Sequence, residues 1–143
     1  MKEYLAMSKK IRAVFVIAGC FALSSAATIA AAQTAMPAMR GDGAARYVCG
    51  GIGSDESTAF RTSMRDHPLA LLFARADGAY EADVTVSIQD DKNTTALAFR
   101  ASGPVCLIDL PAGKYVVNAD AGRASKKQSV TVGGGSKSVD FRF

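Results

Sequence analysis

The sequence contains no tryptophan and only one histidine, His67. A histidine that acts as a general base or binds a metal needs partners, and no catalytic motif surrounds it or any serine. We therefore interpret His67 as a surface or capping residue. We predict that the chain is not an enzyme and has no catalytic residue, no metal site and no cofactor. Without tryptophan, Tyr80 is the one candidate for an exposed aromatic ring on which a sugar could stack.

An excess of basic charge is also missing once the first 32 residues are set apart. The whole chain has 17 Lys and Arg against 13 Asp and Glu, and four of the basic residues but only one acidic residue precede residue 33. The rest holds 13 basic and 12 acidic residues, a net charge of +1. Nucleic-acid binding needs a concentrated basic face. We therefore expect no nucleic-acid partner.

Long apolar runs are confined to the first 32 residues. A basic start, an apolar run over residues 13–21 and a run of small residues over 22–32 are typical of an export signal. We predict that residues 1–32 are a signal peptide, cleaved between Ala32 and Gln33. The alternative is a transmembrane helix, but Gly19 and three hydroxyl residues interrupt the roughly 20 apolar residues that a span needs. We expect a periplasmic or secreted protein with no membrane span after cleavage.

A second mode of export is encoded in the same segment. The stretch Ile17-Ala18-Gly19-Cys20 resembles the lipobox of bacterial lipoproteins, in which Cys20 would be acylated and become the N-terminus. Only five apolar residues separate Arg12 from this stretch, and apolar residues continue after Cys20, where a lipoprotein usually becomes polar. We keep a lipoprotein anchored through Cys20 as the alternative localisation.

Cysteine is scarce in the remaining chain, which has only Cys49 and Cys106. An even pair in a small exported protein predicts a disulfide. Closing a loop of nearly sixty residues would stabilise the fold by roughly 3–5 kcal/mol. Two buried free thiols are the alternative. With a single histidine in the chain, the pair supplies no zinc-ligand set.

Three segments precede the predicted strands. Residues 33–45 are small and polar without periodicity, and we expect a disordered linker there. The domain itself is predicted at residues 46–143. Its glycine cluster, Gly50 to Gly53, matches neither a P-loop nor a dinucleotide-binding fingerprint, so we interpret it as a flexible turn.

One helix is predicted, from Ser54 to Asp66. Ser54 is the expected N-cap. Phe60 and Met64 lie four residues apart and share the face that should dock on the sheets. The helix should end at His67, because the residue before a proline avoids the helical region.

From Pro68 onward, apolar and polar residues alternate with the period of two that is typical of strands. Val84, Val86 and Ile88 show this alternation clearly and are predicted to face the core. The other predicted strands lie at residues 46–49, 69–74, 97–99, 105–110, 114–121, 130–132 and 138–143. This pattern predicts a mostly β fold, a seven- to eight-stranded antiparallel β-sandwich with one short helix near the N-terminus of the mature domain.

Two charged stretches have simple structural interpretations. Asp90-Asp91-Lys92-Asn93 lacks the ligand spacing and the closing glutamate of an EF-hand, so we predict a solvated turn and no calcium site. Lys126, Lys127 and Lys137 lie near the last two predicted strands. Lysines on an edge strand discourage pairing between sheets of different molecules, and we favour this role over a ligand patch.

Two stretches carry a family resemblance. Residues 76–86, with the turn Asp77-Gly78 before an alternating strand, and residues 110–117, with a Leu-Pro-x-Gly-x-Tyr hairpin, are similar to carboxypeptidase regulatory-like domains. The resemblance covers about Pro68 to Phe143. It implies a transthyretin-like (prealbumin-like) β-sandwich and a non-catalytic module for stability, interaction or ligand binding. The catalytic zinc of carboxypeptidases lies in another domain.

Three functions are weighed on this basis. The first is a non-catalytic exported module that binds an unknown protein partner or gives structural support in the bacterial envelope. The second is a small carbohydrate-binding module with a glycan partner. The third is a transthyretin-related hydrolase, which fits least. Those enzymes use several histidines and a C-terminal Tyr-Arg-Gly-Ser, whereas this sequence has one histidine and the final residues Val139 to Phe143.

Overall fold

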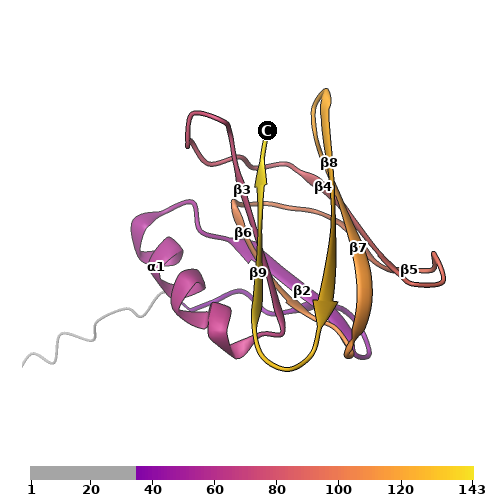
Figure 1. Cartoon of the computed structure of the whole chain (residues 1–143). Coiled ribbons are helices and arrows are strands. Elements are labelled where there is room, and N and C mark those ends of the chain that lie inside the picture. The colour runs from indigo at the N-terminus through magenta and orange to yellow at the C-terminus, as the bar shows by residue number, and fades with distance from the viewer. Residues whose placement is uncertain (1–34) are drawn as a thin grey trace, which may run out of the picture. The chain divides into compact units, whose positions relative to one another are not determined.

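The computed structural model describes residues 35–143, which form a mostly β structure with two sheets and one α-helix (Figure 1). The predicted signal peptide, its cleavage site between Ala32 and Gln33, and Cys20 lie outside the described residues. No helix in the part of the chain that the structure describes is long and apolar enough to cross a membrane.

The larger sheet, called sheet A, has five strands and the smaller, sheet B, has four. In spatial order, sheet A consists of β1 (Arg40–Asp42), β2 (Ala45–Gly50), β6 (Val105–Asp109), β3 (Leu69–Ala74) and β9 (Lys137–Arg142). Sheet B consists of β5 (Thr95–Arg100), β4 (Thr85–Asp90), β7 (Gly113–Ala121) and β8 (Ala124–Val132).

The inner faces of the two sheets share one hydrophobic core. Alternation explains which side chains enter it: in β4, Val86 and Ile88 are buried while Thr85 is exposed. The residues predicted to face inward are all buried, namely Leu69, Val84, Val86, Tyr115, Val117 and Phe141. The last residue is held as well, because the backbone N–H of Phe143 donates to the carbonyl of Ala74 at 2.9 Å.

The strands β3 and β6 are apolar at nearly every position because both of their faces are covered. Their inner residues join the core between the sheets, whereas Ala70 and Leu107 pack with Phe60 on the outer side of sheet A. Burial on both faces removes the polar positions of a half-exposed strand. This explains the apolar sequences LALLFA and VCLID in these two strands.

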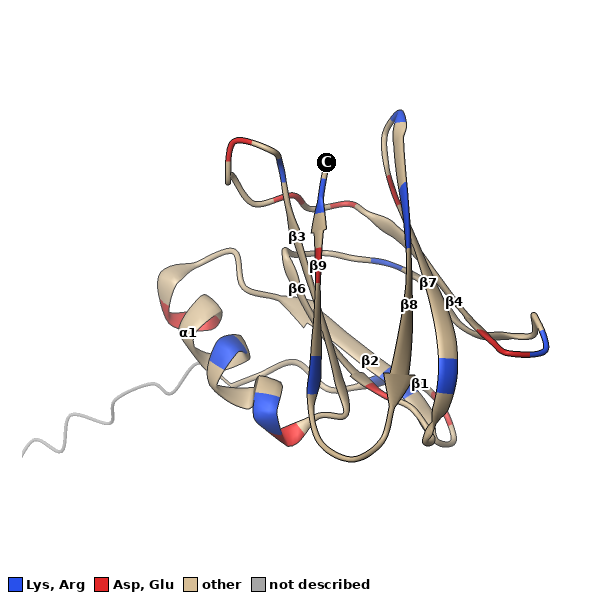
Figure 2. Ribbon diagram, in the orientation of Figure 1, with Lys and Arg blue, Asp and Glu red and all other residues tan. Residues whose placement is uncertain are grey.

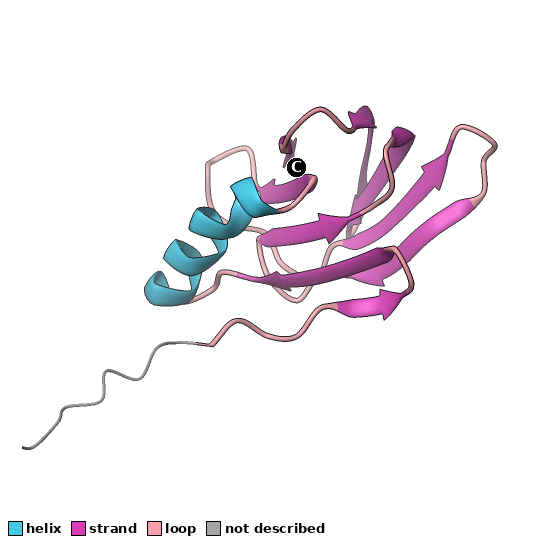
Figure 3. Ribbon diagram, turned by 90° about the horizontal axis from the view of Figure 1, so that it is seen from below, coloured by secondary structure: helices cyan, strands magenta, loops and turns pink. Residues whose placement is uncertain are grey.

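The helix α1 (Ser54–Ser63) lies between β2 and β3 in the chain and continues as one 3-10 turn, η1 (Met64–Asp66). Phe60 is fully buried on the outer face of sheet A and Met64 packs beside it, as the sequence predicts (Figure 3). The predicted N-cap is wrong. Gly53 occupies the N-cap position and no side chain caps the helix.

The structure contains nine strands in its described residues, compared with the seven to eight that the sequence predicts. The additional strand, β1, lies within the segment expected to be a linker, and it pairs with β2 through the register Arg40↔Tyr47. Positive φ values at Gly41 (112°) and Gly43 (60°) allow the tight return of the chain. The same glycines favour a linker in the sequence, and three residues are too few to show a period.

The prediction of an antiparallel fold is wrong at one pair of strands. β9 runs parallel to β3, with Leu69 opposite Lys137 and Ala74 opposite Arg142. After β8 the chain crosses from sheet B to sheet A through the turn at residues 133–136 (Figure 1). It therefore enters sheet A in the direction of β3. A crossover of this kind leaves no mark on the alternation within either strand.

Candidate functional site

The two cysteines of the described chain form the predicted disulfide, Cys49–Cys106. They lie directly opposite each other on the neighbouring strands β2 and β6, with Cα atoms 4.1 Å apart. The bond therefore ties β2, and β1 beside it, to the centre of sheet A.

Tyr115 fixes the hairpin between β6 and β7. Its hydroxyl donates a hydrogen bond of 2.7 Å to the carbonyl of Pro111, four residues earlier. Burial raises the pKa of the Tyr115 hydroxyl above 10.0, and the carboxylates of Asp90 and Asp91 raise it further. The hydroxyl therefore stays protonated at neutral pH and acts as a donor, which gives the tyrosine of the Leu-Pro-x-Gly-x-Tyr stretch a role in the fold.

Replacing Tyr115 by phenylalanine should lower the free energy of unfolding by about 0.5–1.5 kcal/mol through loss of this hydrogen bond. The wild-type protein should also lose stability above about pH 10, because the unfolded chain releases the proton at a lower pH than the folded one. Urea unfolding followed by circular dichroism at pH 8 and pH 10.5 measures both effects. A variant whose stability falls with pH as steeply as that of the wild type would contradict this assignment.

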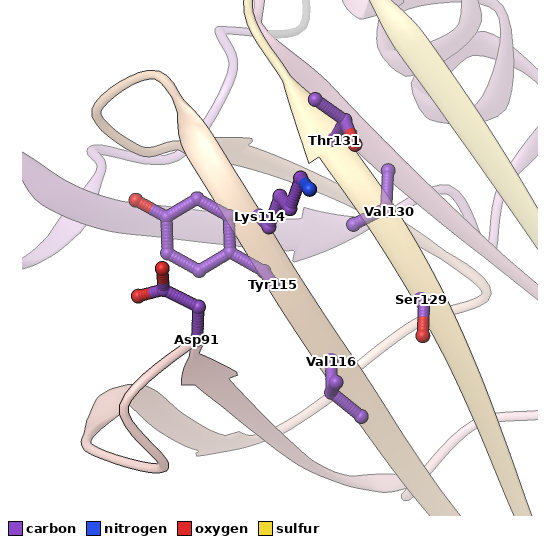
Figure 4. Close-up of a pocket in the computed structure, with 7 residues that line it drawn as sticks. All are labelled: Asp91, Lys114, Tyr115, Val116, Ser129, Val130 and Thr131. Carbon is purple, nitrogen blue, oxygen red and sulfur yellow. The ribbon is translucent and has the colours of Figure 1, made fainter.

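A hollow of about 300 Å³ lies beside Tyr115 on sheet B (Figure 4). It is lined by Asp91, Lys114, Tyr115, Val116, Ser129, Val130 and Thr131. The Tyr115 ring extends from β7 toward the side of Asp91 (Figure 4). One cation, one anion and two hydroxyls can hydrogen-bond a small polar ligand. The tyrosine cannot serve as a base there, because its hydroxyl is protonated and bonded to Pro111.

His67 has a partner that lies 42 residues away in the sequence. Its Nδ1 lies 2.7 Å from Oδ1 of Asp109, whose Oδ2 lies 3.5 Å from Nη2 of Arg46. His67 is also the C-cap residue of η1, and its side chain is 19% exposed. The contact joins the start of β3 to the end of β6. It resembles the orienting half of a hydrolase triad, but no serine hydroxyl in the described residues is hydrogen-bonded to His67.

The glycine cluster has a packing role that the interpretation as a flexible turn missed. Gly50 is buried at the end of β2, where an added Cβ would lie 2.6 Å from the ring of Phe60. Gly103 approaches the backbone of Gly50 so closely that a Cβ there would overlap it. These glycines allow α1 and the β5–β6 turn to pack on the end of β2.

The Asp90–Asn93 turn is held by its own backbone. One oxygen of Asp90 accepts hydrogen bonds from the backbone N–H of Lys92 (2.9 Å) and of Thr94 (2.8 Å). Asn93 adopts the left-handed region (φ 61°), which asparagine tolerates better than most residues. The arrangement is an Asx turn, and it accounts for Asp90 and Asn93 without a ligand.

The lysine-rich strand β8 lies at the edge of sheet B. Lys126 is opposite the buried Ala119, so it lies on the core-facing side of β8, yet its side chain is exposed. Lys127 is opposite Asn118 on the other side. An inward-facing charge on an edge strand obstructs the addition of a further strand. This arrangement favours edge protection over a ligand patch.

Replacing Lys126 by valine should therefore increase self-association, because it removes the charge that prevents the open edge of β8 from pairing. Light scattering at equal protein concentrations measures the effect, and Lys127→Val is the matched control on the opposite side of the strand. If both variants remain as monodisperse as the wild type, the edge does not need this protection.

The exposed aromatic candidate, Tyr80, lies at a second hollow of about 160 Å³ on the outer side of sheet A. Tyr80 is 54% exposed, and its hydroxyl accepts a hydrogen bond of 2.5 Å from Nη2 of Arg61 in α1. The guanidinium carbon lies 5.7 Å from the centre of the ring. The sequence indicated the tyrosine but not the arginine, which comes from a different element.

Charges of both signs are interspersed over the described chain (Figure 2). No group of three or more His, Cys, Asp or Glu side chains within residues 35–143 could hold a metal ion. No protein-family model matches the chain, and no curated protein matches it in sequence.

Proposed function

We propose that this chain is a non-catalytic exported module of the bacterial envelope, which binds a protein partner or gives structural support. One observation carries the proposal. The side chains with the greatest chemical potential each hold two segments of the fold together: Cys49 with Cys106, His67 with Asp109, and Tyr115 with Pro111. A site for chemistry would leave such groups facing a substrate.

Two further observations support this assignment. A disulfide within a small two-sheet domain is typical of exported proteins, in which oxidising conditions preserve it. The hairpin that Tyr115 closes is the most recognisable stretch of the resemblance to carboxypeptidase regulatory-like domains. Together they favour a transthyretin-like β-sandwich, in which β2 to β9 are the eight strands of the domain and β1 is an addition.

The test is to express the full chain in a Gram-negative host with a photo-crosslinking residue at Asn118, on the outer side of sheet B, or at Thr62 in α1. We expect the protein in the periplasmic or membrane fraction, with a discrete crosslinked product from at least one of the two positions. A protein that stays in the cytoplasm and crosslinks to nothing from either face contradicts the proposal.

A small carbohydrate-binding module is the second candidate, and the Tyr80 hollow is the observation that favours it. An exposed aromatic ring held by an arginine can stack against the C–H face of a sugar. A glycan array probed with the wild-type protein and with Tyr80→Ala tests this candidate. Signals that are present for the wild type and absent for the variant support it.

A further inference from the structure

The hollow beside Tyr80 combines residues from three layers of the described structure. Arg61 comes from α1, Leu72 from β3, and Asp140 and Arg142 from β9, while Tyr80 belongs to the loop that follows β3. Leu72 lies directly opposite Asp140 in the sheet, so these residues share the outer face of sheet A. The hollow therefore has an apolar floor with an aromatic ring and three charged groups around it.

The ring of Tyr80 is exposed but held in place. Its hydroxyl is bonded to Arg61, and its backbone forms a β-bridge with Ala74. The next residue, Glu81, donates its backbone N–H to the carbonyl of Phe73 at 3.1 Å. A ring that is already oriented loses little conformational freedom when a ligand stacks on it. Tyr80 is therefore a prepared surface for an apolar face of a ligand.

The charges around this ring favour an anionic ligand. Arg61 and Arg142 are two cations against the one carboxylate of Asp140, and neither arginine forms an ion pair within residues 35–143. A guanidinium has five N–H donors, so Arg61 keeps donors beyond the one that it gives to Tyr80. Arginine binds carboxylates in a bidentate manner. Asp140 can accept hydrogen bonds from hydroxyl groups.

We propose that this hollow binds a carboxylated sugar, such as a uronic acid residue of a glycan, an inference that rests on the carbohydrate-binding candidate above. The C–H face of the sugar stacks on Tyr80. Its carboxylate pairs with Arg142 and the remaining donors of Arg61, and a hydroxyl donates to Asp140. Each of these ligand features answers one feature of the hollow, and a neutral sugar leaves both arginines without a partner.

The test is an NMR titration of the full, oxidised protein with an oligogalacturonate and with the same oligosaccharide in fully methyl-esterified form. We expect saturable binding of the acid, weakened about tenfold or more by esterification and by Arg142→Gln, because a charge-assisted hydrogen bond is lost. Tyr80→Ala should abolish the binding, whereas Tyr80→Phe should retain most of it. Arg65→Gln, in η1 outside the hollow, is the matched control and should bind as the wild type does.

The outcomes separate the two levels of the proposal. If acid and ester bind equally and Tyr80→Ala abolishes both, carbohydrate binding stands and the preference for a carboxylate is overturned. If Arg142→Gln binds the acid as the wild type does, the assigned contact is wrong. If neither form binds, the carbohydrate candidate fails as well, and the proposal of a protein-binding or supporting module is unaffected. Unchanged melting of each variant establishes that the fold is intact.

Discussion

Reduction of the Cys49–Cys106 bond is expected to lower the free energy of unfolding by about 3–5 kcal/mol. The two residues are 57 positions apart, so the bond closes a long loop in the unfolded chain and reduces its conformational entropy. It also ties the β1–β2 hairpin to the central strand β6, which is the only neighbour of β2 on its inner side in sheet A.

Urea unfolding of the oxidised protein, of the same protein in reductant, and of the variant with both cysteines replaced by alanine measures this effect. The reduced protein separates the loss of the bond from the loss of buried volume, because it keeps both sulfur atoms. Equal midpoints for the oxidised and reduced proteins would mean that the bond contributes nothing to stability.

The second large effect is expected at Phe141, where substitution by alanine should destabilise the fold by about 3–5 kcal/mol. Phe141 is fully buried, and its ring lies 5.7 Å from that of Phe73 on the paired strand β3. Truncation leaves a cavity at the junction of β9 with the core. Thermal and urea unfolding followed by circular dichroism provide the measurement.

Phe143→Ala is the matched control for this prediction. Phe143 lies two residues away on the same side of the chain, with its ring 6.5 Å from that of Phe141, but it is only partly buried. Its truncation should cost less than half as much, because most of the removed surface is already in contact with water. Equal losses at the two positions would show that β9 is not anchored through Phe141.

The parts of the fold that sequence predicts well are those with local causes. The alternation of Val84, Val86 and Ile88 places them in the core because each strand has a period of two. The helix ends at His67 because Pro68 follows it. The disulfide follows from the even number of cysteines after the signal segment.

The parts that sequence missed depend on contacts between distant residues. The parallel pairing of β9 with β3 follows from the crossover between sheets, which the residues within those strands do not encode. The contact of His67 with Asp109 and that of Tyr80 with Arg61 join separate elements. A single histidine or an exposed tyrosine carries no sign of its partner, so only half of each pair could be identified.

The central claim is that an exported, disulfide-linked domain begins after the first 32 residues. Peptide mapping of the unreduced protein by mass spectrometry, after isolation from the bacterial envelope, tests it directly. The account predicts one peptide pair linked through Cys49 and Cys106, together with an N-terminus at Gln33 or, for the lipoprotein alternative, an acylated Cys20. Free thiols at both cysteines in a protein that still carries residues 1–32 would contradict it.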